Sequence, residues 1–229
     1  MHQRYDIVLK GLLKNVPVKF LKLLTGYEDG RFLDVQFPDI QLREPDLVIE
    51  VSDGLVFHIE LQFTNDKGMP IRMLEYYTQI LKHYKKEPEQ IVLYVGDGAL
   101  RMSDRIRRRR LRFDYDVRDM REFDCRQLLE SDKPEDIVLS ILCRTEDIDG
   151  TVTSILGKLS LLPARQRADY VTGLLYLTNL RKIYKKVKQE VENMPITVDL
   201  ANCDMYKDGL LEGQRKGLLE GQRKGLLEG

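Results

Sequence analysis

The chain of 229 residues is poor in cysteine and has no long apolar segment. Its cysteines, Cys125, Cys143 and Cys203, are odd in number and form no Cys-x-x-Cys pair. This argues against a disulfide framework and against a zinc site, and it favours a reducing compartment. No run reaches the roughly 18 apolar residues of a membrane helix, and the residues after Met1 form no signal-peptide core. We therefore expect a cytoplasmic protein without a membrane span.

A net charge is also absent, because Lys+Arg and Asp+Glu each number 37. A protein that binds phosphate needs positive potential, so any basic surface here must be local. With 42% hydrophobic and 32% charged residues, the composition is that of a soluble globular protein. The length allows one α/β core plus an appendage.

Hydrophobic periodicity predicts an α/β order in the first half of the chain. A helix is expected from Tyr5 to Thr25, where Pro17 should kink or split it and Gly26 should end it. Strands are predicted at residues 31–37, 45–51, 55–63, 90–95 and 111–117, with a helix at 69–86 between the third strand and the fourth. This order indicates a sheet covered by helices.

The second half is expected to be helical from Cys125 to Glu192, with breaks near Pro134, Gly150 and Pro163. We divide the chain into a core at residues 1–130, a helical region at 131–194, and a linker with a low-complexity repeat tail at 195–229.

The tail repeats Gly-Leu-Leu-Glu-Gly-Gln-Arg-Lys from Gly209, again from Gly217, and starts a third time at Gly225. On an α-helix each repeat rotates by roughly 80° relative to the last, so the leucines form no fixed seam. Each glycine also costs about 1 kcal/mol relative to alanine. A mobile tail is favoured over a helix that forms only with a partner.

Ser52-Asp53-Gly54 lies between two alternating apolar runs and predicts a β-hairpin. With a three-residue loop, Val48 faces His58 and Asp46 faces Glu60, with the Cβ atoms of each pair about 5 Å apart. With a two-residue turn, the register shifts by one and the carboxylates are diagonal to each other. In both cases Asp46 and Glu60 lie within reach of one ion.

Two like charges opposed on paired strands destabilise a sheet unless something compensates them. Hard carboxylate oxygens with no cysteine nearby suit Mg²⁺ or Mn²⁺. Gln62 points to the same face as Glu60, and the backbone carbonyl of Leu61 could complete the coordination. We interpret Asp46, Glu60 and Gln62 as a candidate catalytic site. The alternative is a pair of exposed strand carboxylates.

Pro45-Asp46 followed by Glu60-Leu61-Gln62 matches the PD-(D/E)XK signature, with glutamine in place of lysine. Downstream, the pattern Asp-x-x-Met-x-x-Arg-x-x-x-Tyr is formed by Asp66, Met69, Arg72 and Tyr76. These motifs resemble the recombination-promoting nuclease family, whose members are often labelled transposases. Tyr5-Asp6 with Lys10 is similar to that family's first helix, and the charged repeat tail is similar to its tails. The resemblance covers roughly residues 4–130.

The resemblance implies a restriction-endonuclease-like core, with a mixed central sheet flanked by helices. It also implies a Mg²⁺-dependent endonuclease of recombination or mobile-element biology, which hydrolyses DNA to leave a 5′-phosphate and a 3′-hydroxyl. Asp46 and Glu60 would hold the ion, and Asp6 is a further candidate ligand. Alternatively, Asp6 and Lys10 form an ordinary i,i+4 surface pair. Gln62 can orient water but cannot supply charge, which leaves the source of positive charge open.

Arginines are the candidates for phosphate binding. Arg72 and Tyr76 share one helix face, where Arg72 could clamp a phosphate bidentately or lie on a solvated polar surface. The densest basic run contains Arg107, Arg108, Arg109 and Arg110. It predicts a DNA-binding patch. The alternative is a connector balanced by nearby acidic residues.

Two other functions compete with the nuclease. A nuclease fold whose catalysis has lapsed would act as a DNA-binding or assembly module, which Gln62 permits. A transposase that transfers strands is less favoured, because its usual three-carboxylate core is not evident. One active site per chain that cuts both strands would suggest a homodimer. No sequence-reading module is visible, so we expect little base specificity.

Overall fold

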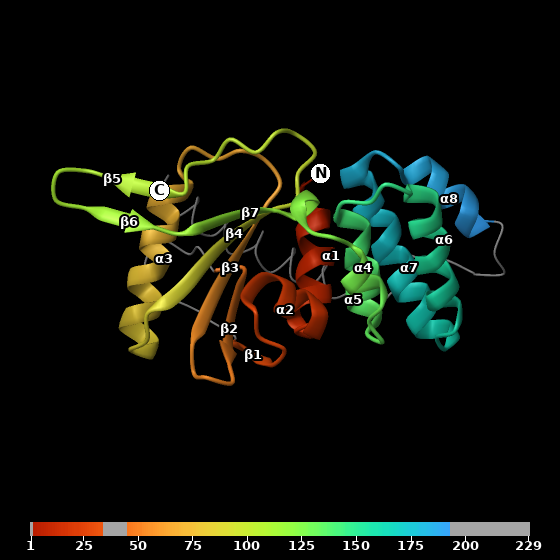
Figure 1. Ribbon diagram of the computed structural model, residues 1–229, viewed down its shortest axis with the longest axis horizontal. Helices are drawn as coiled ribbons and strands as arrows, with labels where there is room; N and C mark the ends of the chain where they lie inside the picture. Colours follow the sequence, from red (N-terminus) through yellow and green to blue (C-terminus); the bar gives the residue numbers. More distant parts are fainter. Residues whose placement is uncertain (1, 34–44, 193–229) are drawn as a thin grey trace, which may run out of the picture.

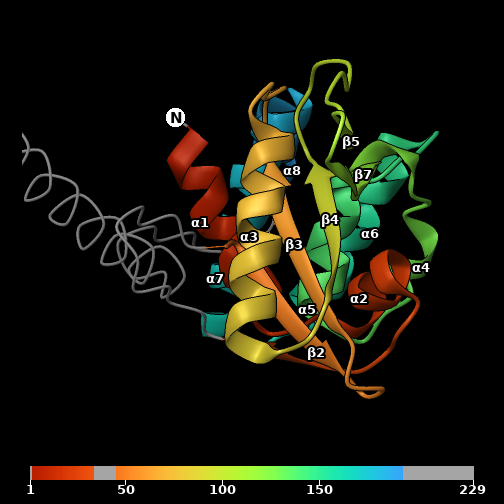
Figure 2. The same cartoon turned by 90° about the vertical axis from the view of Figure 1, so that its left-hand side faces the viewer.

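The computed structural model describes residues 2–33 and 45–192. They form a mixed α/β fold in which a five-stranded sheet has helices on both faces (Figures 1 and 2). In sheet order the strands are β1 (Gly30–Leu33), β2 (Leu47–Val51), β3 (Val56–Gln62), β4 (Pro88–Tyr94) and β7 (Asp116–Asp119). β1, β2 and β3 pair antiparallel, whereas β3, β4 and β7 pair parallel. The expected mixed sheet flanked by helices is therefore confirmed. The predicted strand residues 34–37 and the repeat tail lie outside the described residues.

The β2–β3 hairpin has the predicted three-residue loop. Val48 lies opposite His58, and the N–H of Val51 donates to the carbonyl of Leu55 over 3.0 Å. Gly54 has a φ of +73°, the left-handed conformation that closes such loops and that glycine adopts without strain. Continuing this register by two residues places the two carboxylates of the candidate site opposite each other.

The first predicted helix is split in two, as Pro17 indicated. α1 spans His2–Lys14 and α2 spans Val18–Thr25. The proline ring cannot continue α1, since it lacks an N–H and has a fixed φ, so it becomes the N-cap residue of α2. Gly26 ends α2 with a φ of +86°.

Helices bury both faces of the sheet (Figure 1). α3 (Met69–Tyr84) covers one face, over a buried cluster that includes Val48, Val56 and Val92. On the other face, α1 and α2 share one continuous apolar cluster with the C-terminal helices. Those helices are α4 (Arg126–Leu129), α5 (Pro134–Leu139), α6 (Ile148–Ser160), α7 (Ala164–Thr178) and α8 (Tyr184–Glu192). No described helix is long and apolar enough to cross a membrane.

The single strand predicted at residues 111–117 is wrong. The chain instead forms β6 (Arg112–Asp114) and β7, which belong to different sheets. β6 pairs with β5 (Arg105–Arg107), a strand that the sequence did not predict. Tyr115 marks the change, because its ring is buried and its hydroxyl donates to the carbonyl of Ser103 over 2.5 Å. The contact between Tyr115 and Ser103 fixes the point where the chain passes from one sheet to the other. Hydrophobic periodicity cannot predict a contact of this kind.

The helix break predicted near Gly150 lies a few residues earlier, at residues 143–147, directly before α6. Gly150 lies in the first turn of α6, where its N–H donates to the carboxylate of Asp147, the N-cap residue, over 2.9 Å. The breaks at the two prolines are confirmed, because Pro134 is the first residue of α5 and Pro163 immediately precedes α7.

Asp136 caps a helix that has no capping side chain of its own. The carboxylate is fully buried and accepts the N–H groups of Lys19 (3.1 Å) and Phe20 (2.9 Å) at the start of α2. It also accepts the hydroxyl of Ser131 over 2.7 Å. The interaction fastens the N-terminal helices to the C-terminal ones.

Asp136→Ala is expected to lower the free energy of unfolding by about 3 kcal/mol, because three donors, two of them buried, lose their acceptor. Urea unfolding measures the loss, with Asp132→Ala as a control at an exposed neighbouring carboxylate. A loss below about 1 kcal/mol would contradict the capping role, since that is the size of an average substitution.

Candidate metal and phosphate site

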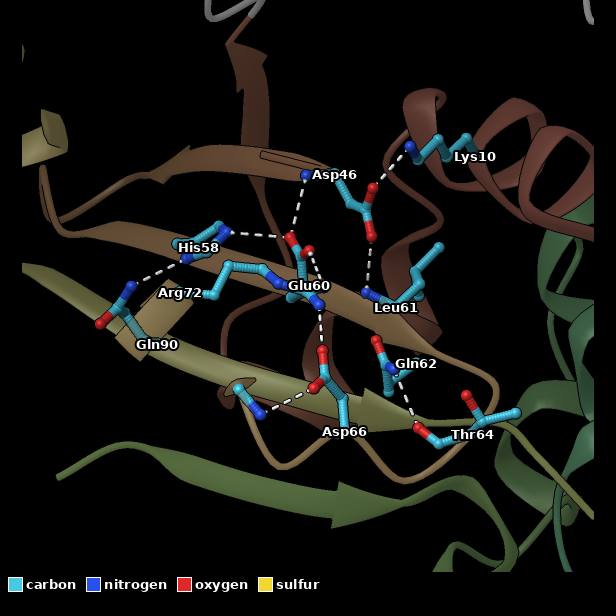
Figure 3. Close-up of polar contacts among 11 residues, drawn as sticks. Lys10, Asp46, His58, Glu60, Leu61, Gln62, Thr64, Asp66, Arg72 and Gln90 are labelled. Carbon is cyan, nitrogen blue, oxygen red and sulfur yellow. Dashed lines mark hydrogen bonds and ion pairs between the residues drawn. The ribbon is translucent and has the colours of Figure 1, made fainter. Parts of the chain in front are cut away.

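Asp46 and Glu60 come together as the hairpin register requires (Figure 3). Asp46 immediately precedes β2, and Glu60 lies near the C-terminal end of β3. The N–H of Asp46 donates to Glu60 Oε2 over 3.3 Å, and the N–H of Leu61 donates to Asp46 Oδ2 over 2.8 Å. Glu60 is only 4% exposed, so these carboxylates are not a pair of exposed strand side chains.

Two basic side chains offset the paired negative charges. Lys10 Nζ from α1 lies 2.5 Å from Asp46 Oδ1, and Arg72 Nη1 from α3 lies 3.4 Å from Glu60 Oε1. They approach the pair from opposite sides (Figure 3). Arg72 also forms an ion pair with Asp66, whose other oxygen accepts the N–H of Gly68 over 2.7 Å. Lys10 on α1 and Arg72 on α3 therefore supply the positive charge that Gln62 cannot supply.

The electrostatics keep Glu60 ionised. Burial acts to raise the pKa of its carboxyl, but the contacts with His58 and Arg72 and the N–H of Asp46 act to lower it. The net direction is a pKa below the ordinary value. Glu60 therefore presents a negative charge at neutral pH, which a metal ligand must do.

His58 joins the site from β3. It is 0% exposed, and its Nε2 lies 3.4 Å from Glu60 Oε2. Its Nδ1 lies 2.9 Å from Nε2 of Gln90 on β4, and its ring packs edge-on against Tyr76 with 4.9 Å between centroids. The sequence reading assigned no role to Gln90.

Other predicted site residues lie elsewhere. The Gln62 amide donates to the carbonyl of Thr64 over 2.9 Å. Tyr76 is 3% exposed and belongs to the core under α3, so the structure does not bring its ring to a phosphate-binding surface beside Arg72. Asp6 lies in α1, but its side chain is outside the described part of the structure.

The residues of the site suit the implied metal only if it needs few protein ligands. Among the described residues, no group of three or more His, Cys, Asp or Glu side chains could hold an ion. Mg²⁺ needs fewer protein ligands, because it is bound through one or two carboxylates, retains water and takes further oxygens from substrate phosphate. Two adjacent hard carboxylates, Asp46 and Glu60, fit that ion and Mn²⁺ and do not fit structural zinc.

The basic run forms the β5–β6 hairpin, which packs against α3, the helix that carries Arg72. Ile106 and Phe113 anchor it, both buried under α3, where the rings of Phe113 and Tyr77 lie 5.5 Å apart. The loop after β3 holds the segment that leads into the hairpin, since Asn65 bonds the carbonyl of Ala99 (2.8 Å) and the N–H of Arg101 (2.6 Å). The hairpin projects past α3, on the side of the molecule away from the C-terminal helices (Figure 1).

The arginines of the hairpin fall into two groups. Arg105 and Arg107 form ion pairs with Asp104 and Asp114, and Arg107 also donates to two backbone carbonyls. The second group consists of Arg108, Arg109, Arg110 and Arg112, which are exposed like the first group. Within the described residues, none of these four has a carboxylate partner. Of the four predicted patch residues, Arg107 is neutralised within the hairpin by Asp114. Arg108, Arg109 and Arg110 remain available to bind an anion.

Comparisons with protein-family models, with curated proteins and with solved structures found no match. The fold and the geometry of the site are therefore the evidence for a function.

Proposed function

We propose that the protein is a metal-dependent DNA endonuclease with a PD-(D/E)XK-type active site. The observation that carries the proposal is the meeting of Asp46, directly before β2, with the buried Glu60 of β3, where two basic side chains flank the pair. Their spacing in the sequence matches the Pro-Asp…Glu-x-Gln motif that resembles recombination-promoting nucleases. A mixed sheet with helices on both faces is compatible with that fold.

In this proposal Asp46 and Glu60 hold Mg²⁺ or Mn²⁺, with the carbonyl of Leu61 as a further ligand. The bound ion would lower the pKa of a water and stabilise charge that grows on the phosphate. Arg72 exchanges its contact with Asp66 for a non-bridging phosphate oxygen, which a guanidinium can bind with two parallel hydrogen bonds. Gln62 turns its amide from Thr64 toward the attacking water and orients it.

DNA is the proposed substrate and partner. The turn of the β5–β6 hairpin and the adjoining Arg112 carry the arginines without a described carboxylate partner, which would bind its phosphates. Phosphate contacts position a duplex without reading its sequence, so little base specificity is expected. A homodimer would let one site per chain cut both strands, and a role in recombination or mobile elements follows from the resemblance.

Nicking of supercoiled plasmid tests the function. The purified full chain should convert supercoiled DNA to the open-circular form with Mg²⁺ or Mn²⁺, and EDTA should stop the reaction. The cut ends should carry a 5′-phosphate, which ligase reseals without kinase treatment. Joined strand-transfer products would instead indicate a transposase. A folded protein that cuts nothing with any divalent metal would overturn the proposal.

One observation favours a second candidate, a nuclease fold with lapsed catalysis that binds DNA. Both carboxylates already have protein donors, and the Gln62 amide is turned to Thr64. Such a pair would stabilise the hairpin without a metal. Retarded migration of DNA in a gel, with no cleavage under any metal, distinguishes this function from the nuclease.

A further inference from the structure

His58 and Gln90 form a polar pair inside an otherwise apolar layer. They lie between the sheet and α3, among buried residues that include Val56, Val92 and Met73. Burying polar atoms costs free energy unless they are hydrogen-bonded, and Gln90 Oε1 is buried with no partner in the described part of the chain. Valine or leucine would fill such positions at lower cost, so the pair calls for a role beyond packing.

The hydrogen bonds of Gln90 fix which imidazole nitrogen carries the proton. Gln90 Nε2 lies 3.0 Å from the carbonyl oxygen of Met73. A carbonyl can only accept, so the amide atom that faces it must be the nitrogen. The same nitrogen lies 2.9 Å from His58 Nδ1 and donates its second hydrogen there. Nδ1 is then the acceptor of the ring, and the proton is on Nε2.

The Nε2–H group faces Glu60. Glu60 Oε2 lies 3.4 Å away, a long contact, and Nε2 makes no shorter hydrogen bond to any described residue. Hydrogen bonds between active-site groups commonly shorten when substrate binds. The chain of contacts therefore runs from Met73 on α3 through Gln90 on β4 and His58 on β3 to the candidate ligand Glu60.

We propose that His58 is a positioning residue, held by Gln90 as the Nε2–H tautomer, which fixes the carboxylate of Glu60 in one orientation toward the metal. The inference rests on the proposed function. It assigns His58 no contact with DNA and no proton transfer. Partners that orient a metal ligand in this way contribute roughly 10–100-fold to metal affinity or activity.

The tautomer is tested directly in the wild-type protein. Long-range ¹H–¹⁵N spectra distinguish a ring protonated at Nε2 from one protonated at Nδ1, and they depend on neither metal nor DNA. The Nε2–H form is expected for His58 at neutral pH. It should become mixed in Gln90→Met, which keeps the volume but removes the amide. A Nδ1–H form in the wild type would overturn the proposal.

Two amide variants test the positioning. Glutamine can place an N–H where Nε2 lies, whereas asparagine reaches only the Nδ1 position. Titration calorimetry with Mn²⁺ should show affinity close to the wild type for His58→Gln and at least about tenfold weaker affinity for His58→Asn. Thermal unfolding of both variants reports what the substitution costs the fold. Equal affinity in the two variants, or equal losses that follow the unfolding temperature, would mean that His58 only packs.

Failure of this inference differs from failure of the nuclease proposal. If the wild type cuts DNA and His58→Asn binds Mn²⁺ and cuts as well, the positioning role fails and the nuclease stands. If the metal affinities change as expected but no protein cuts DNA, the positioning role stands and the nuclease fails. A wild type that binds no Mn²⁺ overturns both.

Discussion

Glu60→Gln and Asp46→Asn are each expected to abolish plasmid nicking. The amides keep the shape of the side chains but remove the negative charge that a hard cation requires. Loss of a residue that only orients a metal ligand already costs roughly 10–100-fold, so loss of a ligand should cost at least about a hundredfold. Single-turnover nicking at saturating Mg²⁺, with Mn²⁺ titration beside it, measures the effect.

The two substitutions should lower the stability of the fold to different extents. In Glu60→Gln, Arg72 keeps its ion pair with Asp66, so no buried charge is stranded. In Asp46→Asn, the largely buried Lys10 faces a neutral amide, and leaving such a charge unpaired destabilises the protein. The unfolding temperature should therefore fall more for Asp46→Asn than for Glu60→Gln.

Glu50→Gln is the matched control. Glu50 is another carboxylate of β2 and forms ion pairs with Lys86 and Arg31, away from the candidate site. Its removal should leave nicking and Mn²⁺ affinity unchanged. If Glu60→Gln cuts as fast as Glu50→Gln, the active site lies elsewhere or the activity belongs to a contaminant.

The carboxylate pair was predictable because every step to it is local. Alternation placed Asp46 and Glu60 on one face, and the Ser52-Asp53-Gly54 loop set the register. A hairpin needs only neighbouring residues to define it. The structure agrees at Val48 and His58, and the carboxylates follow.

The groups around the pair were not predictable, because they come from distant parts of the chain. Lys10 reaches Asp46 from α1, and the sequence offered only an i,i+4 partner for it. Gln90 meets His58 across a parallel pair of strands that are joined through α3. The sequence signal was the polar residue Gln90 at the start of the apolar segment 90–95. This signal does not identify His58 as its partner.

The sequence likewise did not determine which arginines of the basic run are paired with acidic residues. The sequence left a DNA-binding patch and a balanced connector open, and the hairpin contains both arrangements. Strand pairing makes Asp114 a diagonal neighbour of Arg107, and their charges cancel in an ion pair. The turn holds Arg108, Arg109 and Arg110 away from any described carboxylate. Which arginine belongs to which group depends on β5 and β6, which periodicity did not resolve.

We expect weaker DNA binding, and a smaller change of the binding constant with salt concentration, in the triple variant Arg108→Ala, Arg109→Ala, Arg110→Ala. An arginine that neutralises a phosphate releases a counterion, so log K falls with log [salt] by about 0.9 per contact and the slope should decrease by about 2.7 for three contacts. Fluorescence anisotropy with duplex DNA in EDTA measures the slope without cleavage. The buried Ile106 and Phe113 should keep the hairpin in place.

A matched control removes three other positive charges. Lys185, Lys186 and Lys188 lie on α8, at the opposite end of the molecule from the hairpin (Figure 1). Replacing them with alanine changes the net charge by the same amount, so any effect of overall charge appears in both variants. If the two variants change the slope equally, the hairpin holds no phosphates and DNA is bound elsewhere. If only the hairpin variant changes it, and nicking at saturating DNA stays near the wild-type rate, the tip binds substrate and takes no part in the chemistry at Asp46 and Glu60.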